Sequence, residues 1–124
     1  MDKRVLIVDD VSLNRMLAIA FLKKLGWKTF EVDGGSAAIA WLGSNAAVDL
    51  VLLDISMPDL NGEDVCLQIR ANPDHAALKI VAYTAHAASA DEERFLANGF
   101  DAVLIKPISI QSLTDTISGL FPGH

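Results

Sequence analysis

Five short apolar runs recur along the sequence, and each is followed by a longer segment with helical periodicity. The runs are Arg4–Val8, Lys28–Val32, Val48–Leu53, Lys79–Tyr83 and Ala102–Ile105. Apolar runs without polar alternation are typical of strands buried on both faces, as in a parallel sheet that helices cover. This alternation constrains the fold strongly, because two parallel strands need a crossover, usually a helix, between them.

The segments between the runs predict helices with recognisable ends. They cover Leu13–Leu25, Ser36–Leu42, Glu63–Ala71, Ser89 to Asn98-Gly99, and Ile110–Leu120. Glycine follows the first two segments and Asn72-Pro73 ends the third, which are residues that stop helices. On the first helix, one apolar face is expected to contain Leu13, Leu17, Ala20, Phe21 and Leu25.

Five strand–helix alternations within 124 residues predict a single α/β domain over residues 1–124, with no output domain. The expected architecture is a doubly wound (βα)5 flavodoxin-like sandwich, in which helices cover both faces of a five-stranded parallel sheet. Strand order 2-1-3-4-5 suits five strands. In such sheets a functional site lies beyond the carboxyl ends of the strands, where the first and third strands are neighbours.

Charge and hydropathy argue against several classes of function. The chain has 10 basic and 16 acidic residues, and its net charge of −6 disfavours direct nucleic-acid binding because phosphate backbones attract basic surfaces. No stretch approaches the roughly 18 apolar residues of a membrane helix. With a single cysteine, Cys66, the chain forms no internal disulfide. We therefore expect a cytoplasmic protein without a membrane partner.

Polar residues end four of the apolar runs. Asp9-Asp10, Asp54, Thr84 and Lys106 follow the first, third, fourth and fifth runs. Since the carboxyl ends of parallel strands meet at one edge, three carboxylates are expected to lie together there. Carboxylates so close need a compensating cation, and an all-oxygen ligand set favours a hard one such as Mg²⁺ (or Mn²⁺).

This constellation suits phosphoryl transfer. Asp54 is expected to act as a carboxylate nucleophile and to form an acyl phosphate. A divalent ion and Lys106 would neutralise charge on the phosphoryl oxygens, where positioning and electrostatics supply most of the rate. The Thr84 hydroxyl would donate a hydrogen bond to the same oxygens.

The same residues carry a family resemblance. Asp9-Asp10, Asp54, Thr84 and Lys106-Pro107 look like the signature of response-regulator receiver domains with the CheY-like fold, and Asp54–Gly62 (DISMPDLNG) is also similar to that family. The resemblance implies that a histidine kinase or histidine phosphotransfer domain phosphorylates Asp54 in a Mg²⁺-dependent reaction. The domain would then switch its contacts with a downstream protein partner, and it would be a signalling receiver rather than an enzyme with a separate substrate.

Position by position, the resemblance implies a ligand set for the metal. Asp10 would bind Mg²⁺ directly, and Asp9 would bind it mostly through water. Asp54 and the backbone carbonyl of Ser56 would supply the other protein ligands. Mg²⁺ keeps several of its waters in proteins, so this small set is sufficient.

The resemblance also assigns the residues that respond to the phosphate. Lys106 would bridge Asp54 and the phosphoryl group, and its bond to Pro107 would be cis, which proline tolerates. Thr84 would be the switch hydroxyl. Many receivers carry an aromatic residue three positions before the lysine as its partner, but here that position is Val103. The usual coupled hydroxyl–aromatic switch is therefore not expected in its ordinary form.

Two further positions bear on the lifetime of the phosphate. Ser56 lies two residues beyond Asp54, and His86 lies two residues beyond Thr84. In the family, the side chains at these positions flank the path of the hydrolytic water. The run from Tyr83 to Ala87 is similar to receivers of hybrid histidine kinases and phosphorelays.

Other classes of function fit the sequence less well. A phosphatase with an aspartyl nucleophile usually has a second aspartate where this chain has Ser56. A flavodoxin-like cofactor module needs a phosphate-binding loop where Asp9-Asp10 stand, and a receiver-like module that is never phosphorylated would not need the full set of chemical groups. Three contexts stay open: a single-domain regulator, a phosphorelay shuttle, and a receiver cut from a hybrid kinase.

Overall fold

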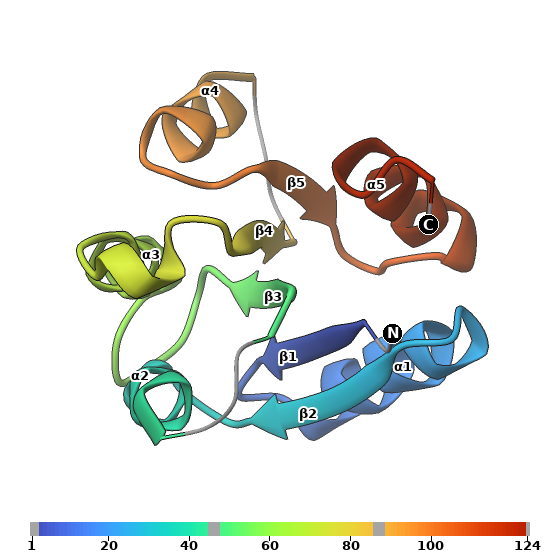
Figure 1. Ribbon diagram of the computed structural model, residues 1–124, viewed down its shortest axis with the longest axis horizontal. Coiled ribbons are helices and arrows are strands. Elements are labelled where there is room, and N and C mark those ends of the chain that lie inside the picture. The colour runs from blue at the N-terminus through green and yellow to red at the C-terminus, as the bar shows by residue number, and fades with distance from the viewer. Residues whose placement is uncertain (1–2, 45–47, 86–88, 124) are drawn as a thin grey trace.

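The computed structural model describes residues 3–44, 48–85 and 89–123, and it has a parallel sheet between two layers of helices (Figure 1). The strands are β1 (Arg4–Val8), β2 (Lys28–Val32), β3 (Leu50–Asp54), β4 (Lys79–Thr84) and β5 (Ala102–Ile105). The helices are α1 (Ser12–Lys24), α2 (Gly35–Ser44), α3 (Gly62–Arg70), the 3₁₀ helix η1 (Pro73–His75), α4 (Ser89–Ala97) and α5 (Ile110–Leu120). The strand order is β2-β1-β3-β4-β5, which confirms the predicted fold.

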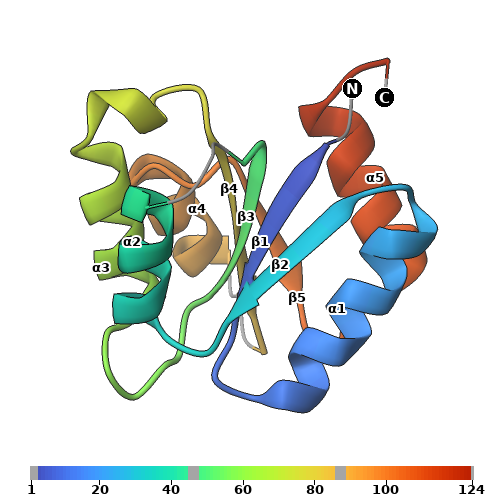
Figure 2. The same cartoon turned by 60° about the horizontal axis from the view of Figure 1, so that its bottom comes forward.

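The helices divide between the two faces of the sheet. Helices α1 and α5 cover one face, and α2, α3 and α4 cover the other (Figure 2). Alternate residues of each central strand supply the two cores: Leu6 of β1 packs with the α2–α4 layer, and Ile7 packs with the α1–α5 layer. Because both faces of β1, β3 and β4 are covered, their apolar runs need no polar alternation.

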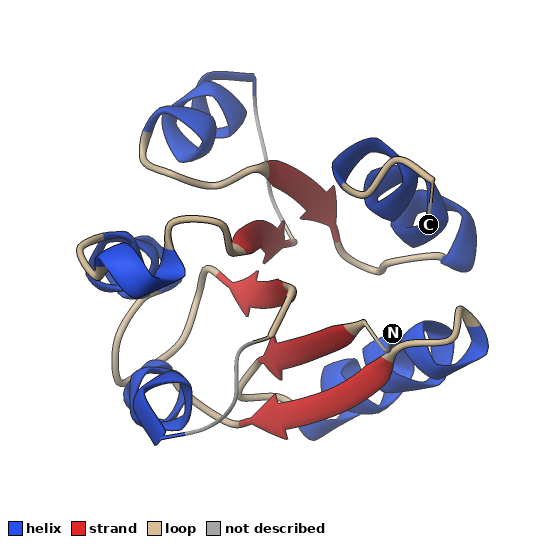
Figure 3. Ribbon diagram, viewed as in Figure 1, coloured by secondary structure: helices blue, strands red, loops and turns tan. Residues whose placement is uncertain are grey.

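The two edge strands are less buried than the three central ones. In β2 no residue is fully buried, and in β5 Leu104 alone is. The pairs Asp54↔Tyr83 and Thr84↔Ile105 extend the ladders, so β3 and β4 include residues that the sequence placed after them. Asp54 and Thr84 are thus the last residues of β3 and β4, and backbone hydrogen bonds hold them in position. Figure 3 shows the strands in red between the blue helices.

The predicted apolar face of α1 is wrong in part. Ala18 and Leu22 are the fully buried residues of this helix, whereas Leu13 is 70% and Leu17 38% exposed. The error has a physical cause, because apolar residues surround most of the circumference of α1 and periodicity alone cannot select its buried face. The exposed residues form an apolar surface on the outside of the helix.

Arg70 joins four segments at the amino-terminal side of β4 and β5. Its guanidinium donates hydrogen bonds to the carbonyl oxygens of Gly99 (3.0 Å), His75 (3.3 Å) and Leu78 (2.6 Å), and to Asp101 Oδ2 (2.7 Å). Asp101 Oδ2 also accepts the backbone N–H of Ile80 at 2.8 Å. A fixed fork of donors suits such a junction, and lysine does not offer it.

None of the helices in the described residues is long and apolar enough to cross a membrane.

Replacing Arg70 tests this junction. Arg70→Ala is expected to lower the free energy of unfolding by about 2–4 kcal/mol, because partly buried carbonyls and the Asp101 carboxylate lose their donors. Arg94→Ala is a matched control, since Arg94 is 50% exposed and pairs with Glu63 and Asp91 at the surface; its cost should stay below about 1 kcal/mol. Urea unfolding monitored by circular dichroism measures both, and equal costs would contradict the assignment.

Candidate functional site

Two buried carboxylates share one ammonium group at the carboxyl ends of the strands. Lys106 is the residue directly after β5, and its Nζ lies 3.0 Å from Asp54 Oδ1 and 3.2 Å from Asp9 Oδ2. Asp9 is fully buried and Asp54 is 2% exposed. A single ammonium cannot neutralise both carboxylates, and Asp10 adds a third one at the surface. The site therefore carries an excess of negative charge within a largely desolvated setting.

The three carboxylates fit a divalent cation. One oxygen of each of Asp9, Asp10 and Asp54 lies within 4.8 Å of the others. Ligands of Mg²⁺ at about 2.0–2.1 Å are separated by no more than about 4 Å, so a small inward movement would complete the set. Asp9 Oδ2 is buried and accepts no hydrogen bond from the described residues, although it faces the Lys106 ammonium. A buried oxygen in that state is suited to a cation, directly or through a bound water.

Asp9 is held by its own turn. Its Oδ1 accepts the backbone N–H of Val11 at 2.9 Å, and its backbone N–H donates to the carbonyl of Val32 at 3.3 Å. The first bond is an Asx turn that leads the chain from β1 into α1. Asp9 thus serves as a turn residue and as a member of the acidic cluster, two roles that the sequence alone cannot separate.

The loop after Asp54 is fixed by a close backbone contact. Gly62 donates its N–H to the carbonyl of Ile55 at 2.9 Å, and a Cβ at Gly62 would overlap the carbonyl oxygen of Asp54. Only glycine permits this approach. The Ser56 N–H donates to Asp54 Oδ1 at 3.3 Å, so the loop also contacts the carboxylate itself. The family-like spacing from Asp54 to Gly62 therefore has a steric reason.

The same loop is tied to the start of α2. Asp59 accepts the backbone N–H groups of Gly35 (3.2 Å) and Ser36 (3.0 Å). These bonds, the one from Ser36 more than the one from Gly35, lower the pKa of the Asp59 carboxyl below its usual range. Sequence reasoning missed this contact, because an aspartate in a loop gives no indication of a partner 23 residues away.

Of the remaining predicted residues, Thr84 and the Lys106–Pro107 bond lie at the ends of β4 and β5, and the others lie elsewhere. Thr84 ends β4 and is 8% exposed, and its carbonyl accepts the N–H of Lys106 at 2.8 Å. The Lys106–Pro107 peptide bond is cis. Val103 lies half-buried on β5, where it packs against the core beneath α2, α3 and α4. Ser56 is exposed in the loop after β3, and His86 lies outside the described residues.

Tyr83 is a further neighbour of the site that the sequence did not single out. Lys106 Nζ lies 4.4 Å from the centroid of its ring, within the range of a cation–π interaction. The tyrosine is 2% exposed, and burial together with the nearby Asp9 carboxylate raises the pKa of its hydroxyl far above the usual value. The phenol is therefore neutral, and its ring helps to position the lysine.

The environment of Asp54 opposes its ionisation. Burial, and to a smaller extent repulsion from the Asp9 carboxylate, raises the pKa of the Asp54 carboxyl from 3.8 to about 6. The hydrogen bond and charge of Lys106, and the N–H of Ser56, act in the opposite direction but do not prevail. Without a metal ion, the folded protein therefore binds a proton at Asp54 more tightly than the unfolded chain does.

This shift predicts how stability depends on pH. Between pH 3.8 and about 6 the folded protein still holds a proton on Asp54 that the unfolded chain has released. The free energy of unfolding therefore falls as pH rises through this window, and the contribution of Asp54 stays low above it. In divalent-free buffer at pH 7.5, Asp54→Asn is expected to raise the free energy of unfolding by about 2 kcal/mol. Urea unfolding at several pH values checks this, and a gain that does not shrink by pH 4 would contradict it.

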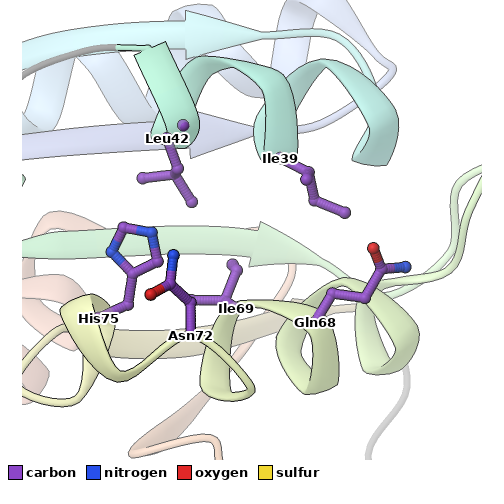
Figure 4. A pocket seen from close by; sticks show the side chains of 7 residues that line it. Ile39, Leu42, Gln68, Ile69, Asn72 and His75 are labelled. Carbon is purple, nitrogen blue, oxygen red and sulfur yellow. The ribbon is translucent and has the colours of Figure 1, made fainter.

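A separate pocket lies between α2 and α3, away from the acidic cluster (Figure 4). Its volume is about 160 Å³, and its lining residues are Ile39, Leu42, Gly43, Gln68, Ile69, Asn72 and His75. Asn72 accepts the N–H of Asp74 and begins η1, the segment that leads toward β4. None of the carboxylates that surround Lys106 reaches this pocket.

Comparison with known proteins gives one consistent family. The response regulator receiver domain model matches residues 5–118. Over 117 residues the chain is 38% identical to the sensor protein GacS of Pseudomonas syringae pv. syringae, covering 92% of this chain but only 13% of GacS. It is 32% identical to the polar-differentiation response regulator DivK of Brucella anthropi, covering 94% of each protein.

A solved structure supports the same relationship. The receiver domain of a sensor histidine kinase from Pseudomonas aeruginosa PAO1 superposes with a TM-score of 0.86 at 28% identity, over 97% of this chain and 98% of that one. That structure holds a magnesium ion coordinated in its active-site cleft.

Proposed function

The chain belongs to the response regulator receiver domains of two-component and phosphorelay signalling, and from this premise we propose that Asp54 is its phosphoacceptor. The single observation that supports this most is the position of Asp54 at the end of β3, buried and 3.0 Å from the Lys106 ammonium. The proposed donor is a phosphohistidine on a histidine kinase or a histidine phosphotransfer domain.

The proposed reaction transfers a phosphoryl group from an imidazole nitrogen of the donor to the carboxylate of Asp54. A carboxylate oxygen of Asp54 attacks phosphorus, the bond from phosphorus to the donor nitrogen breaks, and the imidazole keeps the electron pair and takes up a proton. Lys106 already contacts Asp54 Oδ1, so its charge is in place to stabilise the phosphoryl oxygens as they approach. Burial raises the pKa of the Asp54 carboxyl to about 6, and a bound cation would favour its ionised, nucleophilic form.

We place the cation at the acidic cluster. Its proposed ligands are Asp10 directly, Asp9 mostly through water, Asp54, and the backbone carbonyl of Ser56. The hard oxygen set and the excess of carboxylate charge over the single Lys106 ammonium support Mg²⁺ or Mn²⁺. The ion supplies charge neutralisation for the phosphoryl oxygens when it is bound.

The readout of the phosphate is proposed to start at Thr84. Its position at the end of β4, beside Lys106, places the hydroxyl on the strand next to the acceptor. Val103 has neither the ring nor the length of the aromatic residue found there in many receivers, so its movement would expose little new surface. We propose that Ser56 and His86 tune the phosphate lifetime, and that turnover is limited to the protein's own phosphoryl group.

The surface of α1 is suited to the donor protein. Leu13, Met16 and Leu17 of α1 and the N-cap residue Val11 are between 38% and 70% exposed. The helix itself begins at Ser12, two residues after Asp10. Scattered exposed apolar residues are ordinary, but a contiguous group beside a reactive site indicates an interaction surface. We propose that an apolar helical face of the phosphohistidine protein packs there and brings its imidazole to Asp54.

Phosphorylation by a small donor tests the acceptor. The purified chain incubated with acetyl phosphate and Mg²⁺ should gain one phosphoryl group by intact mass. Asp54→Asn should gain none, and excess chelator should abolish the reaction in the wild type. Full modification of Asp54→Asn would disprove the acceptor assignment, whereas steady turnover of p-nitrophenyl phosphate would favour a phosphatase instead.

The docking surface has its own test. The pair Leu13→Ser and Leu17→Ser should slow transfer from a phosphorylated histidine phosphotransfer domain by about tenfold or more, while labelling by acetyl phosphate stays unchanged. Leu67→Ser is the control, because Leu67 is 52% exposed on α3 rather than α1. The donor is chosen from a panel as the domain that transfers fastest to the wild type. Equal slowing of both reactions would show damage to the site instead of lost docking.

A further inference from the structure

The side chain of Arg15 reaches back from the first turn of α1 to the end of β1. Its Nη1 donates a hydrogen bond of 2.7 Å to the backbone carbonyl of Asp9, and its Nε pairs with Glu31 Oε1 at 2.7 Å. The Arg15 side chain is 16% exposed, whereas that of Glu31 is 48% exposed. The guanidinium is therefore held between the end of β2 and the turn that carries the acidic pair.

The carbonyl that Arg15 contacts belongs to the peptide unit joining Asp9 to Asp10. A peptide unit is planar from one Cα to the next, so fixing its carbonyl also fixes the direction in which the Cα of Asp10 leaves the turn. Asp9 has further anchors in its own N–H and in Oδ1. Asp10 is exposed, and the described hydrogen bonds and ion pairs give its side chain no anchor. Its orientation therefore depends on the peptide before it.

We propose that Arg15 is a positioning residue for the metal site, acting through the Asp9–Asp10 peptide to aim the Asp10 carboxylate at the cation. The inference rests on the proposed function, since the cation is the ligand concerned. Glu31 supports this role, because its carboxylate holds the Arg15 guanidinium in the orientation that the bond to the Asp9 carbonyl requires.

Positioning and charge make opposite predictions at this residue. Arg15 is a cation close to a cation site, so by electrostatics alone its removal should tighten Mg²⁺ binding. If Arg15 orients a ligand, its removal should weaken binding, since groups that orient metal ligands typically contribute tenfold or more to affinity. The sign of the change therefore separates the two effects without reference to activity.

The experiment measures the Mg²⁺ dissociation constant of the full chain by isothermal titration calorimetry, with Mn²⁺ binding by electron paramagnetic resonance as a second readout. Arg15→Gln is expected to weaken binding by about tenfold. Arg15→Lys keeps the positive charge but loses the planar guanidinium that contacts Asp9 and Glu31 together, and it should weaken binding by several-fold. Arg94→Gln removes a remote arginine and should leave the constant within about twofold.

A double-mutant cycle with Asp10→Asn tests the route through Asp10. In that background Arg15→Gln should no longer weaken binding, because the carboxylate it orients is gone. Urea unfolding of each variant checks that the fold is retained, and Arg15→Lys serves as the milder variant if Arg15→Gln does not fold.

The outcomes separate this inference from the proposed function. If the wild type binds no Mg²⁺, the proposed function fails and this inference fails with it. If the wild type binds Mg²⁺ and folded Arg15 variants bind it equally or more tightly, the positioning role alone is overturned. An undiminished effect of Arg15→Gln in the Asp10→Asn background would also overturn it, since Arg15 would then act on another part of the site.

Discussion

The contact on which the site depends is that of the Lys106 ammonium with the buried carboxylates of Asp9 and Asp54. Neither carboxylate would tolerate its low exposure without a cation, and one lysine cannot satisfy both. The imbalance is visible in the raised pKa of Asp54 and in the sharing of one ammonium by Asp9 Oδ2 and Asp54 Oδ1. The folded protein thus holds a deficit of positive charge at the point where a divalent ion fits.

The sheet and its loops maintain this deficit. Because the strands are parallel, β1, β3, β4 and β5 end at one edge, and the cores on both faces keep their register (Figure 2). The loop after Asp54 is confined by Gly62 against its backbone and by Asp59 against α2. This frame holds the buried carboxylates of Asp9 and Asp54 near each other, which is how electrostatic preorganisation is built into a site.

Much of this arrangement could be predicted from the sequence, because one rule connects the strand ends to one place. Asp54, Thr84 and Lys106 each end an apolar run or follow it directly, and parallel topology brings those ends together. The contacts made by Arg15, Asp59 and Tyr83 could not be predicted in this way. They depend on the direction of side chains across the fold, and periodicity carries no information about it. The buried face of α1 was missed for a related reason, since a helix that is apolar on most sides has no single periodic stripe.

Helix α1 connects the two proposals. Its outer surface, with Leu13 and Leu17, is the proposed docking site for the donor, and its inner first turn holds Arg15 on the Asp9 carbonyl. Both features lie within the same two turns of α1, so the two proposed roles use neighbouring parts of one short segment. The exposed side chains of Leu13 and Leu17 are separate from the Arg15 bond to the Asp9 carbonyl, so donor docking and cation positioning can be changed independently.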